Sequence, residues 1–394
     1  MNAGIAARMA DIEPFHVMAI LARARALEAA GHSVIHMEVG EPDFATPQPI
    51  IDAGIAAIAQ RDMHYTPAAG LPILREAIAR FYQTRYGISV DPAHIIVTPG
   101  ASGALLLALG VLLSPGDEVL LADPGYPCNR HFVRLLEGRP INIPVGPQTD
   151  YQLSARSIDA HWRPRTVAAL LSTPSNPTGT LVREDEMAEI ARCVAARGGQ
   201  LIVDEIYHGL TYGEDAATAL SVDPAALIVN SFSKYFQMTG WRLGWLVAPV
   251  KYTREAEKLA QNIFLAPSTP AQYAALAAFE PATIAILEKR RSEFEARRDY
   301  LLPALQTLGF NIPVTPAGAF YLYADCSGFT DDSFAFAKNL LEQAYVAITP
   351  GADFGHHAPE RHVRFAYTTT MAKLAEGVER IGRFLRSGRG QRNL

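Results

Sequence analysis

The sequence predicts an α/β fold in which a large domain, with a mainly parallel seven-stranded sheet flanked by helices, is joined to a smaller α+β domain. Between about residues 94 and 247, short apolar runs alternate with helical patterns, which is typical of parallel sheets covered by helices. After about residue 270 the pattern changes to long helices with a few strands. The 394 residues are enough for two hydrophobic cores.

Seven apolar runs are the strand candidates of the large sheet. They are HIIVT (94–98), DEVLL (117–121), INIPV (141–145), TVAALLS (166–172), QLIVD (200–204), ALIVN (226–230) and WRLGWLVA (241–248). Helix-like segments such as 101–113 and 183–197 lie between several of them. Because the connection before the last run is short, this run is the candidate for an antiparallel member.

The remaining chain predicts the smaller unit. Helical patterns at 271–280, 281–305 and 333–344 are joined by the strand-like segments FNIPV, GAFYLYA, VAITP and HVRFAYT, and a closing helix has apolar residues at helical spacing. The first 45 residues contain no complete core of their own. We therefore expect residues 1–45 to form an N-terminal arm and part of the small domain, 46–280 the large domain, and 281–394 the small C-terminal domain.

Composition narrows the class of protein. The chain is 49% hydrophobic and 19% charged, with a formal net charge of -5, which is typical of a globular enzyme and argues against nucleic-acid binding. The longest apolar run, 104–113, is about half of what a membrane helix needs, and the N-terminus lacks a signal-peptide pattern. Three widely spaced cysteines favour a reducing cytoplasm. The polar tail, 387–394, is predicted to be a frayed end.

The most informative motif is SFSKYFQMTGWR, which places Lys234 just beyond a predicted buried strand. Burying a lysine is costly, and a use for its amine is a Schiff base with an aldehyde cofactor. Ser231, three residues earlier, and Arg242, eight residues later, have suitable side chains for holding a cofactor phosphate. The motif therefore predicts a pyridoxal-phosphate (PLP) enzyme.

Polar residues also follow other predicted strands. Asn176 comes after TVAALLS, and Asp204 closes QLIVD. Because ligands of open α/β sheets bind beyond the carboxyl ends of the strands, we expect these side chains to meet Ser231 and Lys234 at one site.

Gly100, Ala101 and Ser102 open a predicted helix after HIIVT. A helix N-terminus offers backbone N–H groups and a favourable dipole to a phosphate. Taken alone, the segment matches no established phosphate-binding motif and is equally an ordinary glycine turn.

Five residues have candidate roles toward the cofactor or substrate. The Asp204 carboxylate could pair with the pyridine nitrogen of PLP, or cap a turn. Asn176 and Tyr207 could bind the phenolic oxygen, although SNPTG is also a turn signal. Tyr126 could stack on the ring or simply pack. Arg364, on a predicted central strand, could bind a substrate carboxylate or an internal one.

Three histidines near the C-terminal part of the sequence are candidate metal ligands. His356, His357 and His362 have no familiar zinc spacing and no cysteine close in sequence, so we expect no metal and a solvated loop.

Taken together, the motifs resemble the fold-type I PLP-dependent aminotransferases, class I/II, of the aspartate aminotransferase superfamily. The resemblance covers nearly the whole chain. The motifs, in family order, are VGEPDFATP, YTPAAGLPILREAIA, VTPGAS, DPGYP, SNPTG, VDEIY, SFSKYFQMTGWRLGW, PAGAFYLY and VRFAYT. SNPTG, DEIY and SK…GWR are specific as a set, and GAS and DPGYP are less so.

The resemblance implies a role for each matching residue. Lys234 forms the Schiff base and moves the substrate proton, Asp204 pairs with the pyridine nitrogen, and Asn176 and Tyr207 contact the phenolic oxygen. Tyr126 is the stacking aromatic, and the phosphate-binding positions are Gly100, Ala101, Ser102, Ser231 and Arg242. Tyr65 matches a tyrosine that reaches the phosphate from the neighbouring subunit, which implies a homodimer. Arg364 binds the α-carboxylate, with Asn176 and the backbone of Gly40 as further substrate contacts.

The implied activity is a ping-pong transamination from an L-amino acid to a 2-oxo acid such as 2-oxoglutarate or pyruvate. One alternative is a C–S lyase or another β-eliminating enzyme of the same fold. Another is a non-catalytic PLP-sensing regulator, which would need a DNA-binding segment for which this chain has no room. FHVMAI (15–20), in place of the mobile segment over the pocket, is bulky and uncharged. With Tyr321 and Tyr323, of which alternation allows at most one to face the site, it favours a neutral or aromatic donor, with aspartate as a second candidate.

Overall fold

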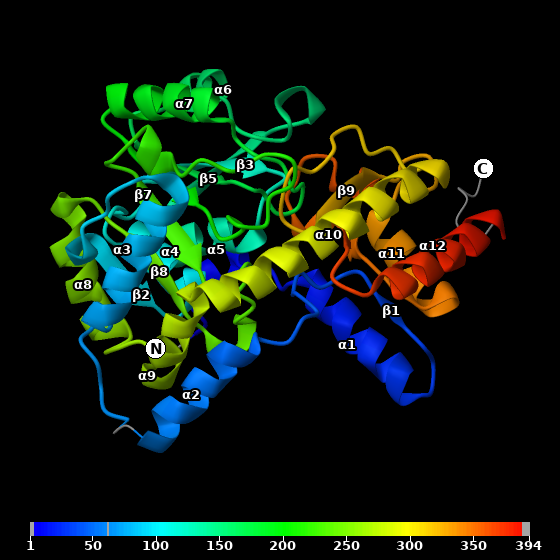
Figure 1. Cartoon of the computed structure of the whole chain (residues 1–394). Helices are drawn as coiled ribbons and strands as arrows, with labels where there is room; N and C mark the ends of the chain where they lie inside the picture. Colours follow the sequence, from blue (N-terminus) through cyan, green and yellow to red (C-terminus); the bar gives the residue numbers. More distant parts are fainter. Residues whose placement is uncertain (1–3, 61–62, 388–394) are drawn as a thin grey trace.

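The computed structural model describes residues 4–60 and 63–387, so most of the predicted frayed tail lies outside the described residues. Figure 1 shows a large sheet covered by helices, beside a smaller group of strands and helices formed by the C-terminal part and the N-terminal arm. None of the helices in the described ranges is long and apolar enough to cross a membrane.

The large sheet has seven strands in the order β2-β8-β7-β6-β5-β3-β4. Their bounds are β2 Ile95–Thr98, β3 Glu118–Asp123, β4 Arg139–Pro144, β5 Thr166–Ser172, β6 Gln200–Asp204, β7 Leu227–Ser231 and β8 Gly244–Val247. β8 is antiparallel to both of its neighbours, β2 and β7, and the pairs from β7 to β4 are parallel. The predicted mainly parallel sheet with an antiparallel last strand is therefore confirmed.

Helices cover both faces of this sheet. Alternate strand residues enter two cores: Ile202 and Val229 pack with α4 (Gly100–Gly110) and α8 (Val250–Ile263), whereas Val203 and Ile228 pack in the core of the other face. That second face is covered by α3 (Pro72–Tyr86) and α7 (Glu184–Ala196), among others. Because both faces are buried, the central strands are apolar throughout, as the sequence runs predicted.

The other helices of the large unit complete its periphery. They are α2 (Gln48–Gln60), α5 (Pro127–Leu135), α6 (Ala155–His161) and α9 (Thr269–Leu276). The predicted helix 271–280 ends earlier than expected, in a 3-10 turn over Ala277–Phe279. The reason is Pro281, because a residue before proline is driven out of the helical region, and Glu280 is extended at ψ 141°.

The smaller unit contains an antiparallel sheet in the order β11-β12-β9. Its elements are α10 (Pro281–Thr307), β9 (Tyr321–Asp325), α11 (Ser333–Ala344), β10 (Val346–Ala347), β11 (Thr349–Pro350), β12 (His362–Ala366) and α12 (Met371–Arg386). FNIPV forms only an isolated bridge at Asn311, since Pro313 has no N–H to donate to a sheet ladder.

The N-terminal arm packs on this C-terminal unit. β1 (Ile35–His36) pairs in parallel with β10, and α1 (His16–Ala29) contacts β11 and α11. The segments before α1 and after β1 reach the ends of the large-sheet strands, since Phe15 and Gly40 line the same cavity as Asp204.

Candidate active site

The carboxyl ends of three adjacent parallel strands bring the predicted site residues together. β5, β6 and β7 end at Ser172, Asp204 and Ser231, and Lys234 follows β7 by three residues. Lys234 Nζ donates a hydrogen bond of 2.7 Å to the carbonyl of Gly40, which lies just after β1. Burial lowers the pKa of the Lys234 amine to about 8. A substantial fraction of this amine is therefore unprotonated, and nucleophilic, near neutral pH.

Two adjoining cavities meet at this lysine. The first, here called the apolar cavity, has a volume of about 180 Å³, and the second, the serine-lined cavity, about 380 Å³. Both are lined by Val39, Gly40, Tyr126, Asp204, Ile206 and Lys234. A ligand that contacts Lys234 can therefore extend into either space.

The serine-lined cavity has the groups expected for an anion. Ala101 and Ser102, in the first turn of α4, line it together with Ser231, Ser233 and Arg242. The first backbone N–H groups of a helix have no acceptor within the helix, and its dipole favours negative charge there.

Two glycines allow these groups to approach one another closely. Gly100 has φ +69°, and a Cβ built on it would lie 2.6 Å from Arg242 Nη2. A Cβ on Gly244 would lie 2.8 Å from the backbone nitrogen of Ala101. Arg242 itself is held in the left-handed region at φ 54°, with Nη1 donating to the carbonyl of Thr239 at 2.9 Å. The chain thus forms a compact cationic cradle whose donor set fits a phosphate group.

Asp204 is the buried acid of the site. It is 4% exposed, and the backbone N–H of Ile206 donates to its Oδ1 at 3.2 Å. Burial raises the pKa of the Asp204 carboxyl to about 7, partly offset by that hydrogen bond and by the charge of Lys234. A cationic partner, such as a protonated pyridine nitrogen, would favour its ionised form.

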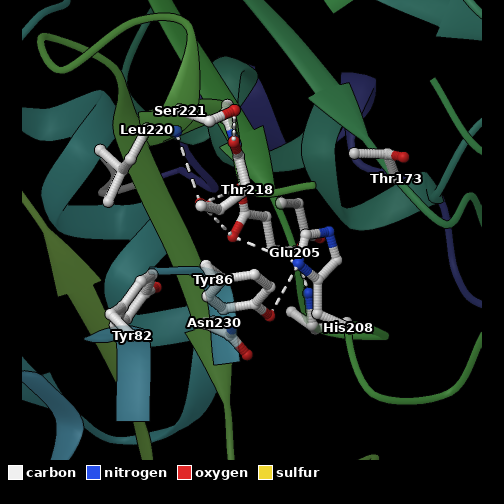
Figure 2. Close-up of polar contacts among 12 residues, drawn as sticks. Tyr82, Tyr86, Thr173, Glu205, His208, Thr218, Leu220, Ser221 and Asn230 are labelled. Atoms are coloured by element: carbon white, nitrogen blue, oxygen red, sulfur yellow. Dashed lines mark hydrogen bonds and ion pairs between the residues drawn. The ribbon is translucent and has the colours of Figure 1, made fainter. Parts of the chain in front are cut away.

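A second set of buried polar groups surrounds Glu205, the residue that follows Asp204 in the chain (Figure 2). Glu205 Oε1 accepts hydrogen bonds from the backbone N–H of Ala219 at 2.8 Å and from the Thr218 hydroxyl at 3.0 Å. His208 Nδ1 lies 3.5 Å from Glu205 Oε2 and 3.1 Å from the Tyr86 hydroxyl. Burial raises the pKa of Glu205 to about 8 and lowers that of His208 to about 3. This cluster was not predicted from the sequence.

Arg364 lies on β12 and is 4% exposed. Its Nη1 donates to Asn176 Oδ1 at 2.8 Å, and its Nη2 donates to the carbonyl of Glu38 at 2.5 Å and to the Thr349 hydroxyl at 3.2 Å. Its buried Nε has no hydrogen-bond partner among the described residues. The groups there that accept from its other two nitrogens are all uncharged, and none of them is a carboxylate.

The apolar cavity is closed by the start of the N-terminal helix. Phe15, Val17 and Met18 line it, so the bulky FHVMAI segment lies where the resemblance implied. The carboxylate of Asp353 accepts hydrogen bonds of 2.8 Å from the backbone N–H groups of both His16 and Val17. Tyr126 lies beneath this segment, edge-on to Phe15 at a centroid distance of 6.4 Å.

The two tyrosines of β9 have different surroundings. Tyr321 lines the apolar cavity, whereas the Tyr323 ring stacks on His362 at a centroid distance of 4.8 Å. The expectation that at most one of them faces the site is met. The backbone N–H groups of His356 and His357 donate to the Asp123 carboxylate.

One predicted residue is not brought to the others. Tyr65 is 81% exposed and lines neither cavity.

Three residues with close contacts to the site were not predicted from the sequence. Ser233 could have been found, because it follows Ser231 at the two-residue spacing of one strand face. Asp353 and Glu205 had no local signal, since their roles depend on contacts formed only in the folded chain.

The comparisons with known proteins agree with this geometry. The family aminotransferase class I and II matches residues 32–381. Valine–pyruvate aminotransferase of Mycobacterium tuberculosis is 38% identical over 380 residues, covering 96% of this chain and 98% of that protein. Aspartate aminotransferase of Geobacillus stearothermophilus is 37% identical, covering 97% and 98%. A crystal structure of an aminotransferase from M. tuberculosis superposes with a TM-score of 0.95 at 38% identity, covering 98% of this chain and all of that one.

The fold and the site define a PLP-dependent transferase. The chain belongs to the class I and II aminotransferase family, and it is a PLP-dependent aminotransferase that acts on amino acids and 2-oxo acids.

Proposed function

We propose that the two cavities divide the ligands of this aminotransferase between them. The serine-lined cavity holds the phosphate of PLP through Gly100, Ala101, Ser102, Ser231 and Arg242. The apolar cavity receives the amino acid, whose α-carboxylate binds Arg364. The observation that carries this proposal is that Lys234 and Asp204 line both spaces, with anion-binding groups on one side and a buried arginine without a carboxylate partner on the other.

The residues of the boundary then have distinct tasks. PLP, when bound, supplies an electron sink that acidifies the Cα–H bond of an amino acid. Lys234 would hold the cofactor covalently, and its free amine would serve as the base that takes the proton from Cα. Asp204 would pair with the pyridine nitrogen. Tyr207 and Asn176 would contact the phenolic oxygen, and Tyr126 would stack against the ring.

We further propose that the favoured amino donor has a neutral aliphatic or aromatic side chain. Lys234 and Arg364 are the two cationic residues lining the apolar cavity, and its entrance is formed by Phe15, Val17 and Met18. A second carboxylate would enter this space without a dedicated partner, which is unfavourable. The Mycobacterium relative is named for valine and pyruvate and the Geobacillus relative for aspartate, so aspartate is the competing candidate.

The assembly we propose is a cytoplasmic homodimer. Tyr65 at 81%, Ile55 at 60% and Ile58 at 63% are exposed in the isolated chain. Exposed apolar side chains of this kind favour contact with a second copy. In such a dimer Tyr65 reaches the phosphate bound by the neighbouring subunit.

The test is the visible absorption spectrum of the PLP-loaded protein with single amino acids. We expect a neutral donor to remove the cofactor's visible band and 2-oxoglutarate or pyruvate to restore it, with kcat/KM for valine or phenylalanine at least about tenfold above that for aspartate. Equal or better use of aspartate would overturn the donor proposal. Release of pyruvate and ammonia without an acceptor would identify elimination instead. A Lys234→Ala variant with full activity would overturn the role of Lys234.

A further inference from the structure

We propose that Tyr321 is a positioning residue, which directs the only hydroxyl proton of Tyr207 toward the cofactor and supports the guanidinium of Arg364. This inference rests on the proposed function and adds a residue to it. It starts from a buried pair of hydroxyls at the floor of the apolar cavity.

The two hydroxyls are in direct contact. Tyr207 OH and Tyr321 OH are 2.8 Å apart, and the residues are 4% and 1% exposed. Burial raises the pKa of both phenols, so each carries its proton at neutral pH. One proton lies between the two oxygens, and the other must find a different acceptor.

The surroundings decide which residue donates. Within the described part of the chain, Tyr207 is the only hydrogen-bond partner of the Tyr321 hydroxyl. Both hydroxyls line the apolar cavity, and in the proposed function Tyr207 contacts the cofactor's phenolic oxygen, which accepts a hydrogen bond. If Tyr207 donated to Tyr321, the phenolic oxygen would lose the Tyr207 proton. If Tyr321 donates, both hydroxyl protons have an acceptor. The second arrangement is therefore favoured.

The position of Tyr321 is built into the backbone opposite it. A Cβ on Gly40 would lie 1.8 Å from the Tyr321 hydroxyl oxygen. The hydroxyl thus occupies space that only glycine leaves free, and the carbonyl of the same glycine accepts from Lys234 Nζ. Position 40 must therefore be glycine to leave room for the Tyr321 hydroxyl, in addition to any backbone contact that Gly40 makes to the substrate.

The ring of Tyr321 has a second neighbour. The Arg364 guanidinium carbon lies 4.3 Å from the centroid of this ring. A cation over an aromatic face is attracted by the ring quadrupole. Removing only the hydroxyl therefore separates the two effects, because phenylalanine keeps the ring beneath Arg364.

The experiment is a pH titration of the bound cofactor's visible absorption in wild type, Tyr321→Phe, Tyr207→Phe and the double variant. A hydrogen bond to the phenolic oxygen stabilises its anionic form, so weakening that bond raises the pH midpoint. We expect Tyr321→Phe to raise the midpoint by about 0.5–1 unit, Tyr207→Phe to raise it at least as much, and the double variant to match Tyr207→Phe.

Tyr323→Phe is the matched control, because it removes a hydroxyl from the same strand outside the cavity. It should leave the midpoint unchanged. Additive shifts in the double variant, or an unchanged midpoint in Tyr321→Phe, would overturn the inference. A wild-type protein with no Lys234-dependent visible band would instead overturn the proposed function.

A second measurement tests the ring. Tyr321→Leu should raise KM for the amino donor at least about threefold above that of Tyr321→Phe, with both variants folded by circular dichroism. Equal KM values would remove the Arg364 part of the inference.

Discussion

Two neighbouring carboxyl groups at the end of β6 differ in their surroundings, because one lines the cavities and the other does not. Asp204 lines both cavities, whereas the next residue, Glu205, is fully buried among Thr218, Ala219 and His208. Burial raises the pKa of both carboxyls. Since a second anion beside Asp204 would oppose its ionisation, a protonated Glu205 leaves Asp204 as the group that responds to a cationic ligand.

The elevated pKa of Glu205 predicts a specific pH dependence of stability. The folded chain keeps a proton on Glu205 up to about pH 8, whereas the ordinary pKa is 4.5, so the free energy of unfolding falls as pH rises between these values. Glu205→Gln removes this proton. Between pH 5 and 8, we expect wild type to lose about 2–4 kcal/mol more stability than the variant, measured by urea unfolding of the cofactor-free protein.

Asp204 titrates in the same window and its charge is coupled to Glu205, so wild type and Glu205→Gln are both compared in an Asp204→Asn background. The exposed Glu184 offers a control, because Glu184→Gln should change the slope little. Parallel stability curves for wild type and Glu205→Gln would show that Glu205 is ionised in the folded protein.

For single residues, the sequence predicts the site residues that follow strands more readily than the residues that contact and orient those site residues. Lys234, Asp204 and Ser231 could be predicted because burial of the preceding strand and the polarity of the next residue are both visible in the sequence. The direction of the Tyr207 proton and the neutrality of Glu205 depend on partners that the chain brings together only on folding.

Among the elements, α1 has an unusual start. Phe15 provides no side-chain cap, and the Asp353 carboxylate from the smaller unit binds the first two backbone N–H groups of the helix instead. These N–H groups have no acceptor within a helix, and a carboxylate there also interacts favourably with the dipole. Asp353 therefore fixes the segment that closes the apolar cavity.

We predict that Asp353→Ala loosens this closure. The free energy of unfolding should fall by about 1–2 kcal/mol, and KM for the amino donor should rise about three- to tenfold with a smaller change in kcat. Steady-state kinetics and thermal unfolding measure the two effects.

Ser154→Ala is the matched control, because Ser154 caps α6 through the N–H group of Ser157 and lines neither cavity. It should lower stability without raising KM. A KM increase of the same size in both variants would mean that the effect of Asp353 is only on stability.

The sequence predicted where this element lies but not what holds it. The family resemblance placed FHVMAI over the pocket, whereas its cap is a carboxylate 337 and 336 residues away from the two N–H groups. A helix start with a local signal was easier, as for α10, whose start at Pro281 agrees with the predicted helix 281–305.

For the whole molecule, the proposed dimer makes each site depend on two chains. Tyr65→Ala should weaken PLP binding about tenfold or more without removing Lys234. Lys234→Ala should abolish activity. In a hybrid dimer of these two variants, the Tyr65→Ala subunit keeps its lysine and receives an intact Tyr65 from its partner.

Mixing Tyr65→Ala with Lys234→Ala should therefore restore PLP affinity and activity at one of the two sites of each hybrid dimer. PLP affinity is measured by titration with PLP after subunit exchange. Each variant mixed with itself is the control. No recovery in hybrids confirmed by sedimentation or mass would show that Tyr65 does not act across the interface.

The layered α/β architecture could be predicted at this scale because alternating apolar runs and helical patterns specify it directly. The insertion of β8 between β2 and β7 could not, because antiparallel character alone does not state which strands are neighbours. The domain boundaries at 45 and 280 stay predictions.

That insertion also governs when the cofactor site can first exist during synthesis. Residues 95–98 find their sheet partner only in residues 244–247, and Gly244 is the position that packs against Gly100 and Ala101. A ribosome-bound chain that has not yet released residue 247 contains Gly100 but lacks the strand that pairs with β2 in the folded protein. Binding of PLP therefore indicates that β8 has taken its place between β2 and β7. A chain truncated before β8 should bind no PLP.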